Sequence, residues 1–134
     1  MKSTLPSKKN ILVIDDHQSI RYLLGAMLSK EFTVTTLKDG IEGLAWMMKG
    51  NIPDLILLDM EMPKLGGEAF LKHVKNSGFS RNIPVIILSG NEDDQRIQLC
   101  KELGALDYLK KPFNPFQLKD SITSAMALDR IVIV

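Results

Sequence analysis

Five short apolar runs, separated by amphipathic stretches, dominate the pattern of hydrophobic and polar positions along the chain. The runs cover residues 11–14, 32–36, 55–58, 85–88 and 106–109. A run of four or five apolar or β-branched residues bounded by turn-forming residues is typical of a strand that is covered on both faces. The pattern therefore predicts five strands, of which those at residues 11–14 and 55–58 are expected to be buried.

The stretches between the runs have the spacing of helices that bury one face, with apolar residues three and four positions apart. The residues expected to face the core are Ile20, Leu23, Leu24, Met27 and Leu28, then Ile41, Leu44, Ala45 and Met48, then Phe70, Leu71 and Val74, then Ile97, Cys100 and Leu103, and finally Leu118, Ile122, Ala125 and Met126. Lys72 and Lys75 are expected to lie away from the apolar face of the third helix. The sequence thus predicts five helices alternating with the five strands.

This alternation predicts an α/β fold in which a parallel sheet carries helices on both faces through right-handed crossovers. For five strands we expect the flavodoxin-like order 2-1-3-4-5. One domain is expected over residues 10–128. Residues 1–9 are expected to form a flexible lead, and residues 129–134 a tail or the start of a linker.

Composition narrows the class of protein only slightly. The chain of 134 residues is 45% hydrophobic and 25% charged, and its formal net charge of +1 gives no reason to expect nucleic acid as a direct partner. No apolar run approaches the ~18 residues of a membrane span. Cys100 is the single cysteine, so an internal disulfide and a cysteine-built zinc site are excluded. We therefore expect a cytoplasmic protein.

Chemistry-bearing side chains follow four of the five predicted strands. Asp15 and Asp16 come after the first strand, Asp59 after the third, Ser89 after the fourth and Lys111 after the fifth. Ligands of open α/β sheets bind at the carboxyl ends of the strands. Crowded carboxylates repel one another and favour a hard cation such as Mg²⁺, while an ammonium and a hydroxyl can stabilise a transferring phosphoryl group. The set predicts phosphoryl transfer to an aspartate.

Each of these residues also has an ordinary structural interpretation. Asp16 could cap a helix, Ser89 could bond a loop backbone, and Lys111 could be a solvated surface charge. His17 is expected to be a helix-start residue rather than a metal ligand, and His73 is expected to face solvent. Five suitable residue types at four strand ends nevertheless favour a site.

The chain closely resembles the receiver domain of two-component response regulators, which are CheY-like proteins. The matching segments are residues 11–16 (ILVIDD), 54–63 (DLILLDMEMP), 84–90 (PVIILSG) and 104–113 (GALDYLKKPF), in the order and spacing of the family. The resemblance covers residues 8–128.

The resemblance implies a role for each site residue. Asp59 would be the phosphoacceptor, and Mg²⁺ would be held by Asp15, Asp16, Asp59 and the backbone carbonyl of Glu61. Lys111 would pair with Asp59 before transfer and with the phosphoryl group afterwards.

The resemblance also implies a switch. The Lys111–Pro112 peptide bond would be cis. After phosphorylation, Ser89 would bond a phosphoryl oxygen and the ring of Tyr108 would move inward. The face formed by the fourth helix, fifth strand and fifth helix would then change shape.

The resulting hypothesis is a signalling module rather than an enzyme, with self-catalysed transfer and slow autodephosphorylation. Its partners would be a histidine kinase or histidine phosphotransfer protein, and a downstream target or output domain. A homodimer through the switch face is left open. The alternatives are a haloacid-dehalogenase-like aspartyl phosphatase, in which Glu61 stands where an aspartate is wanted, and a non-phosphorylated dimerisation module.

Overall fold

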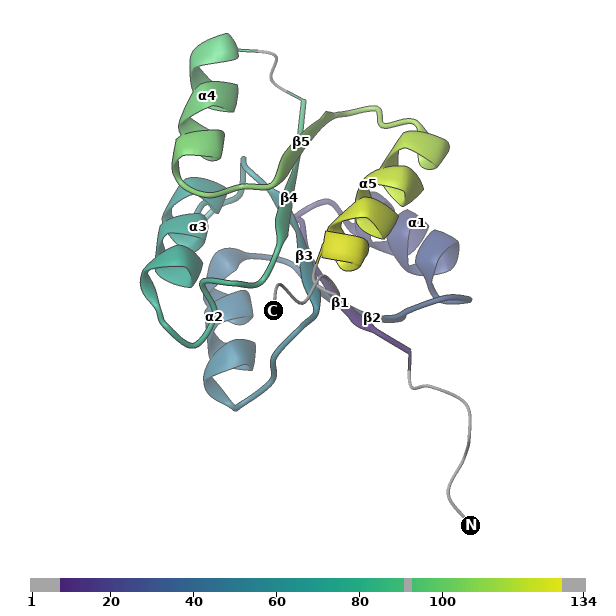
Figure 1. Ribbon diagram of the computed structural model, residues 1–134, viewed down its shortest axis with the longest axis horizontal. Coiled ribbons are helices and arrows are strands. Elements are labelled where there is room, and N and C mark those ends of the chain that lie inside the picture. The colour runs from purple at the N-terminus through teal and green to yellow at the C-terminus, as the bar shows by residue number, and fades with distance from the viewer. Residues whose placement is uncertain (1–7, 91–92, 129–134) are drawn as a thin grey trace.

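Figure 1 shows the computed structural model of the chain, which describes residues 8–90 and 93–128. Most of the predicted lead and the whole predicted tail, residues 129–134, lie outside the described residues. Of the lead, Lys8 and Lys9 are described, and the Lys9 carbonyl accepts a hydrogen bond from the Thr33 N–H at 2.9 Å. The end of the predicted lead thus already contacts the sheet.

The described residues form one sheet of five parallel strands. The strands are β1 (Asn10–Ile14), β2 (Thr33–Leu37), β3 (Leu55–Asp59), β4 (Val85–Ser89) and β5 (Asp107–Lys110). Their order is β2-β1-β3-β4-β5, which confirms the predicted topology. Strand β2 begins one residue later than its apolar run, because the Phe32 N–H donates to the Leu28 carbonyl at 2.9 Å and so belongs to the preceding turn.

Helices cover both faces of this sheet (Figure 1). One face carries α1 (Gln18–Leu28) and α5 (Pro115–Leu128), and the other carries α2 (Gly40–Met48), α3 (Gly67–Asn76) and α4 (Asp94–Glu102). The predicted arrangement of helices is therefore confirmed over the described residues. None of the helices in this part of the chain is long and apolar enough to cross a bilayer.

Two separate hydrophobic cores lie on the two faces of the sheet. Side chains alternate along each strand, so that in β3 Ile56 and Leu58 point to the core under α2, α3 and α4, while Leu55 and Leu57 point to the core under α1 and α5. All five residues of β3 are buried. Packing on both faces of the sheet therefore holds β3 in place along its whole length, including Asp59 at its end.

The predicted core face of α2 is wrong. Of the predicted residues, Leu44 packs against the core, but Ile41, Ala45 and Met48 are exposed, Met48 by 86%. Gly40, Gly43 and Met47 are the buried residues of this helix. A Cβ on Gly43 would lie 2.6 Å from Ile14 Cδ1, so α2 uses this glycine to approach the sheet closely. The apolar pattern missed that face because glycine has no side chain to count.

Two other helix predictions also need correction. On α1, Leu24 and Leu28 are buried as predicted, but Leu23 is exposed. On α3, Lys75 is half-buried rather than turned away, and its Nζ donates to the carbonyl oxygens of Ile83 at 2.7 Å and Arg81 at 3.0 Å. Burial lowers the pKa of the Lys75 ammonium. The long aliphatic stem lets this lysine cross the edge of the core while its charge stays hydrogen-bonded.

The corrected face of α2 gives a matched pair of stability predictions. Met47→Ala should lower the free energy of unfolding by about 2 kcal/mol, because it removes a buried side chain from a packed core. Met48→Ala should change it by less than about 0.5 kcal/mol, since the side chain is exposed. Urea denaturation followed by circular dichroism measures both, and equal losses would contradict the observed orientation of α2.

Candidate functional site

The carboxyl ends of β1, β3, β4 and β5 bring the predicted site residues to one edge of the sheet. Asp59 is the last residue of β3, and Ser89 is the last residue of β4. Their strands are in parallel register, with Asp59 opposite Leu88 and Ser89 opposite Lys110. Because the strands end together, short connections are enough to gather the side chains that follow them.

Asp59 is a buried acid with an unsatisfied oxygen. The side chain is 3% exposed, and its Oδ1 accepts a hydrogen bond from the Glu61 backbone N–H at 3.3 Å. No described residue hydrogen-bonds to Asp59 Oδ2. Burial and the neighbouring Asp15 carboxylate raise the pKa of Asp59 from 3.8 to about 6, against the opposing effects of the Lys111 ammonium and the Glu61 N–H. A desolvated carboxylate whose oxygen is not hydrogen-bonded by any described residue can accept a group or bind a metal ion.

Lys111 reaches into the same group of acids. Its Nζ lies 2.7 Å from Asp15 Oδ2 and 3.4 Å from Asp59 Oδ1, and its side chain is 16% exposed. The interpretation of Lys111 as a solvated surface charge is therefore wrong. The Lys111–Pro112 peptide bond is cis, and the Lys111 N–H donates to the Ser89 carbonyl at 2.7 Å. In this state Lys111 is closer to Asp15 than to Asp59.

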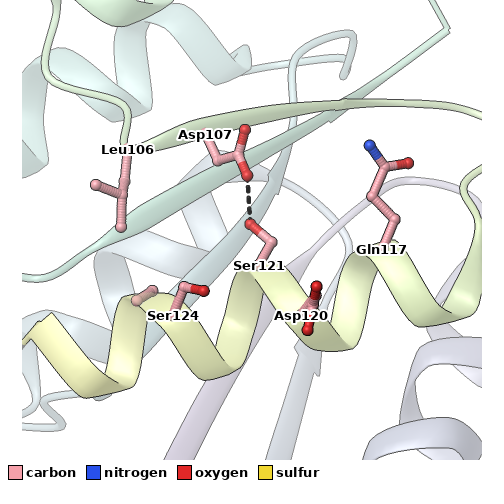
Figure 2. Close-up of a pocket in the computed structure, with 7 residues that line it drawn as sticks. Leu106, Asp107, Gln117, Asp120, Ser121 and Ser124 are labelled. Carbon is pink, nitrogen blue, oxygen red and sulfur yellow. Dashed lines mark hydrogen bonds between the residues drawn. The ribbon is translucent and has the colours of Figure 1, made fainter.

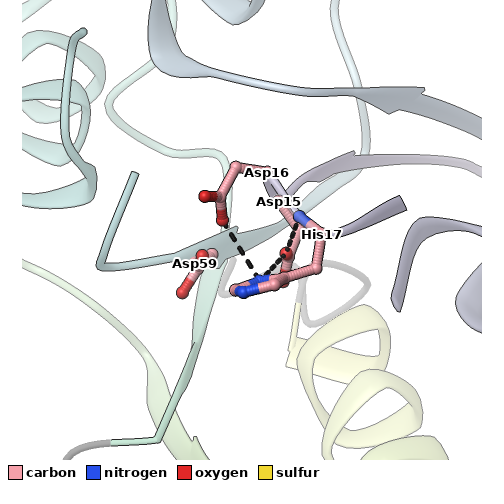
Figure 3. Close-up of side chains that lie close together, drawn as sticks. All are labelled: Asp15, Asp16, His17 and Asp59. Carbon is pink, nitrogen blue, oxygen red and sulfur yellow. Dashed lines mark hydrogen bonds and ion pairs between the residues drawn. The ribbon is translucent and has the colours of Figure 1, made fainter. Parts of the chain in front are cut away.

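The two acids after β1 differ in their surroundings. Asp15 is 1% exposed, and its Oδ1 accepts the His17 backbone N–H at 2.8 Å. Asp16 is half-buried, and its buried Oδ1 has no hydrogen-bond partner among the described residues. His17 is the N-cap residue of α1, so the expectation of a helix-start residue is confirmed and Asp16 is not that cap. Figure 3 shows the three residues gathered beside Asp59.

This group has the donors that a hard divalent cation needs. Ligand atoms of Asp15, Asp16, His17 and Asp59 all lie within 4.8 Å of one another. Asp16 Oδ1 and Asp59 Oδ2 are buried, and within residues 8–90 and 93–128 nothing hydrogen-bonds to them. A cation between them would satisfy both oxygens and relieve the repulsion among the acids. The residues present therefore fit a divalent metal.

Two arginines that sequence patterns did not single out border this group. Arg21 on α1 donates from Nη1 to the backbone carbonyl of Asp15 at 2.7 Å. Arg96 on α4 donates from Nη1 to Glu61 Oε1 at 2.9 Å, which joins α4 to the loop after Asp59. Both contacts join residues on different elements, so only the fold brings the partners together.

The loop after Asp59 returns the chain tightly to α3. Lys64 has a φ of 63°, and the Gly67 N–H donates to the Met60 carbonyl at 3.2 Å. A Cβ on Gly67 would lie 2.5 Å from the Asp59 carbonyl oxygen and 2.6 Å from Met60 Cα. A larger residue would therefore push α3 away from the backbone of Asp59. Gly66, by contrast, has room for a side chain.

The predicted switch residues lie beside this site. Ser89 is fully buried, and Tyr108 on β5 is half-buried and packs against the core under α2, α3 and α4. The positions of Ser89 and Tyr108 are compatible with a switch, but movement stays a prediction.

A separate hollow lies between β5 and α5 (Figure 2), where Ser121 Oγ donates to Asp107 Oδ2. Most of its lining side chains are polar: Asp107, Gln117, Asp120, Ser121 and Ser124.

Residues 11–123 match the family model described as the response regulator receiver domain. The chain is 36% identical over 121 residues to sporulation initiation phosphotransferase F of Bacillus subtilis, covering 90% of this chain and 95% of that protein. It is 28% identical over 130 residues to hybrid signal transduction histidine kinase D of Dictyostelium discoideum, covering 96% of this chain but only 8% of that relative.

Solved structures of the same kind share the fold. Chemotaxis response regulator CheY4 of Vibrio cholerae is 31% identical with a TM-score of 0.83, over 89% of this chain and 99% of that one. A response regulator from Chloroflexus aurantiacus is 27% identical with a TM-score of 0.85, over 90% and 99%. The Mn²⁺-bound form of response regulator Rcp1 is 25% identical with a TM-score of 0.73, over 94% and 98%.

Proposed function

This chain belongs to the family of response regulator receiver domains, and from that premise we propose that Asp59 is its phosphoacceptor. The donor is a phosphohistidine on a histidine kinase or a histidine phosphotransfer protein. An Asp59 oxygen attacks phosphorus, the phosphorus–nitrogen bond of the donor breaks as the new phosphorus–oxygen bond forms, and the departing imidazole nitrogen takes up a proton. The observation that carries this proposal is the buried Asp59 Oδ2, which no described residue hydrogen-bonds and which lies beside an ammonium and two further acids.

The neighbouring residues divide the electrostatic work. Asp16 Oδ1 and Asp59 Oδ2, to which no described residue donates a hydrogen bond, would hold Mg²⁺. Asp15 and the Glu61 carbonyl would complete the site directly or through water. When bound, Mg²⁺ supplies positive charge that offsets the incoming phosphoryl oxygens. Lys111 Nζ contacts both Asp15 and Asp59, and after transfer it can form an ion pair with a phosphoryl oxygen instead. The Mn²⁺-bound form of response regulator Rcp1, a structural relative, supports a divalent cation here.

Phosphorylation would act on a partner through the face formed by α4, β5 and α5. The phosphoryl group brings negative charge and strong hydrogen-bond acceptors next to Ser89, whose hydroxyl can donate to them. Movement of Ser89 would be followed by inward movement of the Tyr108 ring, which is half-buried on the neighbouring strand β5. The shape of this face then reports the state of Asp59. A homodimer through this face is one of its proposed uses.

The wider setting is also a proposal. The receiver domain occupies residues 10–128, and a kinase supplies its phosphoryl group while a target or output domain reads its state. Among the relatives, the matched region makes up nearly all of one protein and a small part of another, so both a stand-alone and a built-in receiver are represented. A cytoplasmic setting is proposed from the single cysteine. Direct nucleic-acid binding by this domain is not proposed.

Labelling with a small phosphodonor tests the acceptor function directly. Incubation with Mg²⁺ and acetyl phosphate or phosphoramidate should add one phosphoryl group per chain, measured by intact mass. Chelation of the cation should prevent labelling, because the carboxylates then remain unscreened. Tryptic mapping should place the added mass on the peptide that contains Asp59.

The same assay separates the phosphatase alternative. A receiver domain should incorporate one group and release it slowly, whereas an aspartyl phosphatase should turn over a metabolite phosphate many times. Steady release of inorganic phosphate from such a substrate would favour the phosphatase. A chain that takes no label from either donor would favour the dimerisation module.

A further inference from the structure

His17 lies with its imidazole against the acidic cluster. His17 Nδ1 is 3.1 Å from Asp15 Oδ1 and 3.2 Å from Asp16 Oδ1 (Figure 3). Hard Mg²⁺ selects oxygen ligands, whereas an imidazole nitrogen suits first-row transition metals. The ring therefore brings a donor of a different kind to an otherwise all-oxygen site.

The position of His17 is fixed by its backbone rather than by its ring. The His17 N–H donates to Asp15 Oδ1 at 2.8 Å, and the side chain makes no capping hydrogen bond to α1 although His17 is the N-cap residue. The side chain is 60% exposed. The imidazole is thus held beside the acids by its own contacts with them, and it makes no capping hydrogen bond to the helix.

Two other donors of the cluster are available to a metal ion. Asp59 is almost fully buried, and its Oδ2 has no hydrogen-bond partner among the described residues. The buried Oδ1 of Asp16 accepts no hydrogen bond from them either, although it lies 3.2 Å from His17 Nδ1. Neighbouring ligands of an octahedral ion with bonds of about 2.2 Å lie about 3.1 Å apart. The separations of His17 Nδ1 from the Asp15 and Asp16 oxygens match that spacing.

We propose that His17 Nδ1 is an additional ligand of the cation site, which makes the site favour a first-row transition-metal dication such as Mn²⁺ over Mg²⁺. The proposal rests on the proposed function only in treating the acidic cluster as a cation site. At present Nδ1 faces the Asp15 and Asp16 carboxylates, and Asp15 Oδ1 accepts its proton. Metal binding releases that proton to solvent or moves it to Nε2, and the Nδ1 lone pair then points to the metal. Nitrogen ligation raises the affinity for Mn²⁺ while leaving that for Mg²⁺ nearly unchanged.

Cation binding to the full chain tests this in three proteins. Calorimetric titration with Mn²⁺ and with Mg²⁺ compares the wild type with His17→Gln and with His73→Gln. The chain has two histidines, and His73 is exposed on α3, so His73→Gln is a matched control. We expect His17→Gln to weaken Mn²⁺ binding by roughly tenfold and Mg²⁺ binding by less than about twofold. His73→Gln should change neither.

A spectroscopic signal then identifies the bond itself. Pulsed electron paramagnetic resonance of bound Mn²⁺ should show coupling to an imidazole nitrogen in the wild type and in His73→Gln, and no such coupling in His17→Gln. Tighter binding of both cations by His17→Gln would mean that the ring competes with the metal, and would overturn the proposal. Equal weakening of both cations without nitrogen coupling would also overturn it. Absence of Mn²⁺ binding in all three proteins would remove the cation site, whereas failure of phosphoryl labelling alone would leave the metal result intact.

Discussion

Asp59→Asn should abolish labelling by acetyl phosphate completely, while the protein remains folded. Asparagine has the same shape and keeps an oxygen that can accept the Glu61 N–H, but its amide is not a nucleophile toward phosphorus. The experiment is the intact-mass assay with Mg²⁺, run over the time in which the wild type gains one phosphoryl group. Circular dichroism of the variant checks the fold.

A matched control lies on the same chain segment. Asp54 comes just before β3, at the opposite end from Asp59, where its Oδ2 accepts the Asn10 N–H at 2.7 Å. Asp54→Asn removes the same charge from the same sequence neighbourhood and should leave labelling intact. Undiminished labelling of Asp59→Asn would show that another residue is the acceptor.

The same substitution should stabilise the fold at neutral pH when no divalent cation is present. Burial and the Asp15 carboxylate raise the pKa of Asp59 from 3.8 to about 6. The folded chain thus binds the Asp59 proton more tightly than the unfolded chain does. The cost of ionising Asp59 in the fold is absent below the unfolded pKa, grows as the pH rises between the two values, and is complete above the folded pKa.

The expected size follows from the shift. Because the pKa of Asp59 moves by about two units, Asp59→Asn should raise the free energy of unfolding by about 3 kcal/mol at about pH 8 and by almost nothing at about pH 4. Urea denaturation at both pH values in the presence of a chelator measures this. Added Mg²⁺ should narrow the difference by stabilising the wild type. A variant that is less stable than the wild type at about pH 8 would contradict the observed crowding of acids.

Most of the architecture could be predicted from the sequence because the central strands β1, β3 and β4 are short, buried and mostly apolar, and amphipathic helices alternate with all five strands. The strand order and the gathering of Asp15, Asp59 and Lys111 at one edge follow from that alternation. The orientation of α2 did not follow, since its closest contact with the sheet is made by Gly43. A search for periodic apolar residues does not detect a glycine that lies close to the sheet because it has no side chain.

The detailed electrostatics of the site also lay beyond the sequence. Lys111 approaches Asp15 more closely than Asp59, and His17 faces two carboxylates at once. These contacts of Lys111 and His17 depend on side-chain conformations that differ by only a few ångströms, and the sequence does not determine those conformations. The Arg96 contact with Glu61 joins a helix to a loop 35 positions earlier, and no local pattern announces such a pairing.

The division of the interior into two layers that share no side chain has a consequence for how this domain tolerates change. Substitutions beneath α1 and α5 act on alternate strand residues such as Leu55 and Leu57, whereas those beneath α2, α3 and α4 act on Ile56 and Leu58. The backbone of a five-stranded sheet insulates one layer from the other. Substitutions accumulated in one layer can therefore change the surface of the helices that cover it and create a contact with a new partner protein. The packing of the other layer is kept.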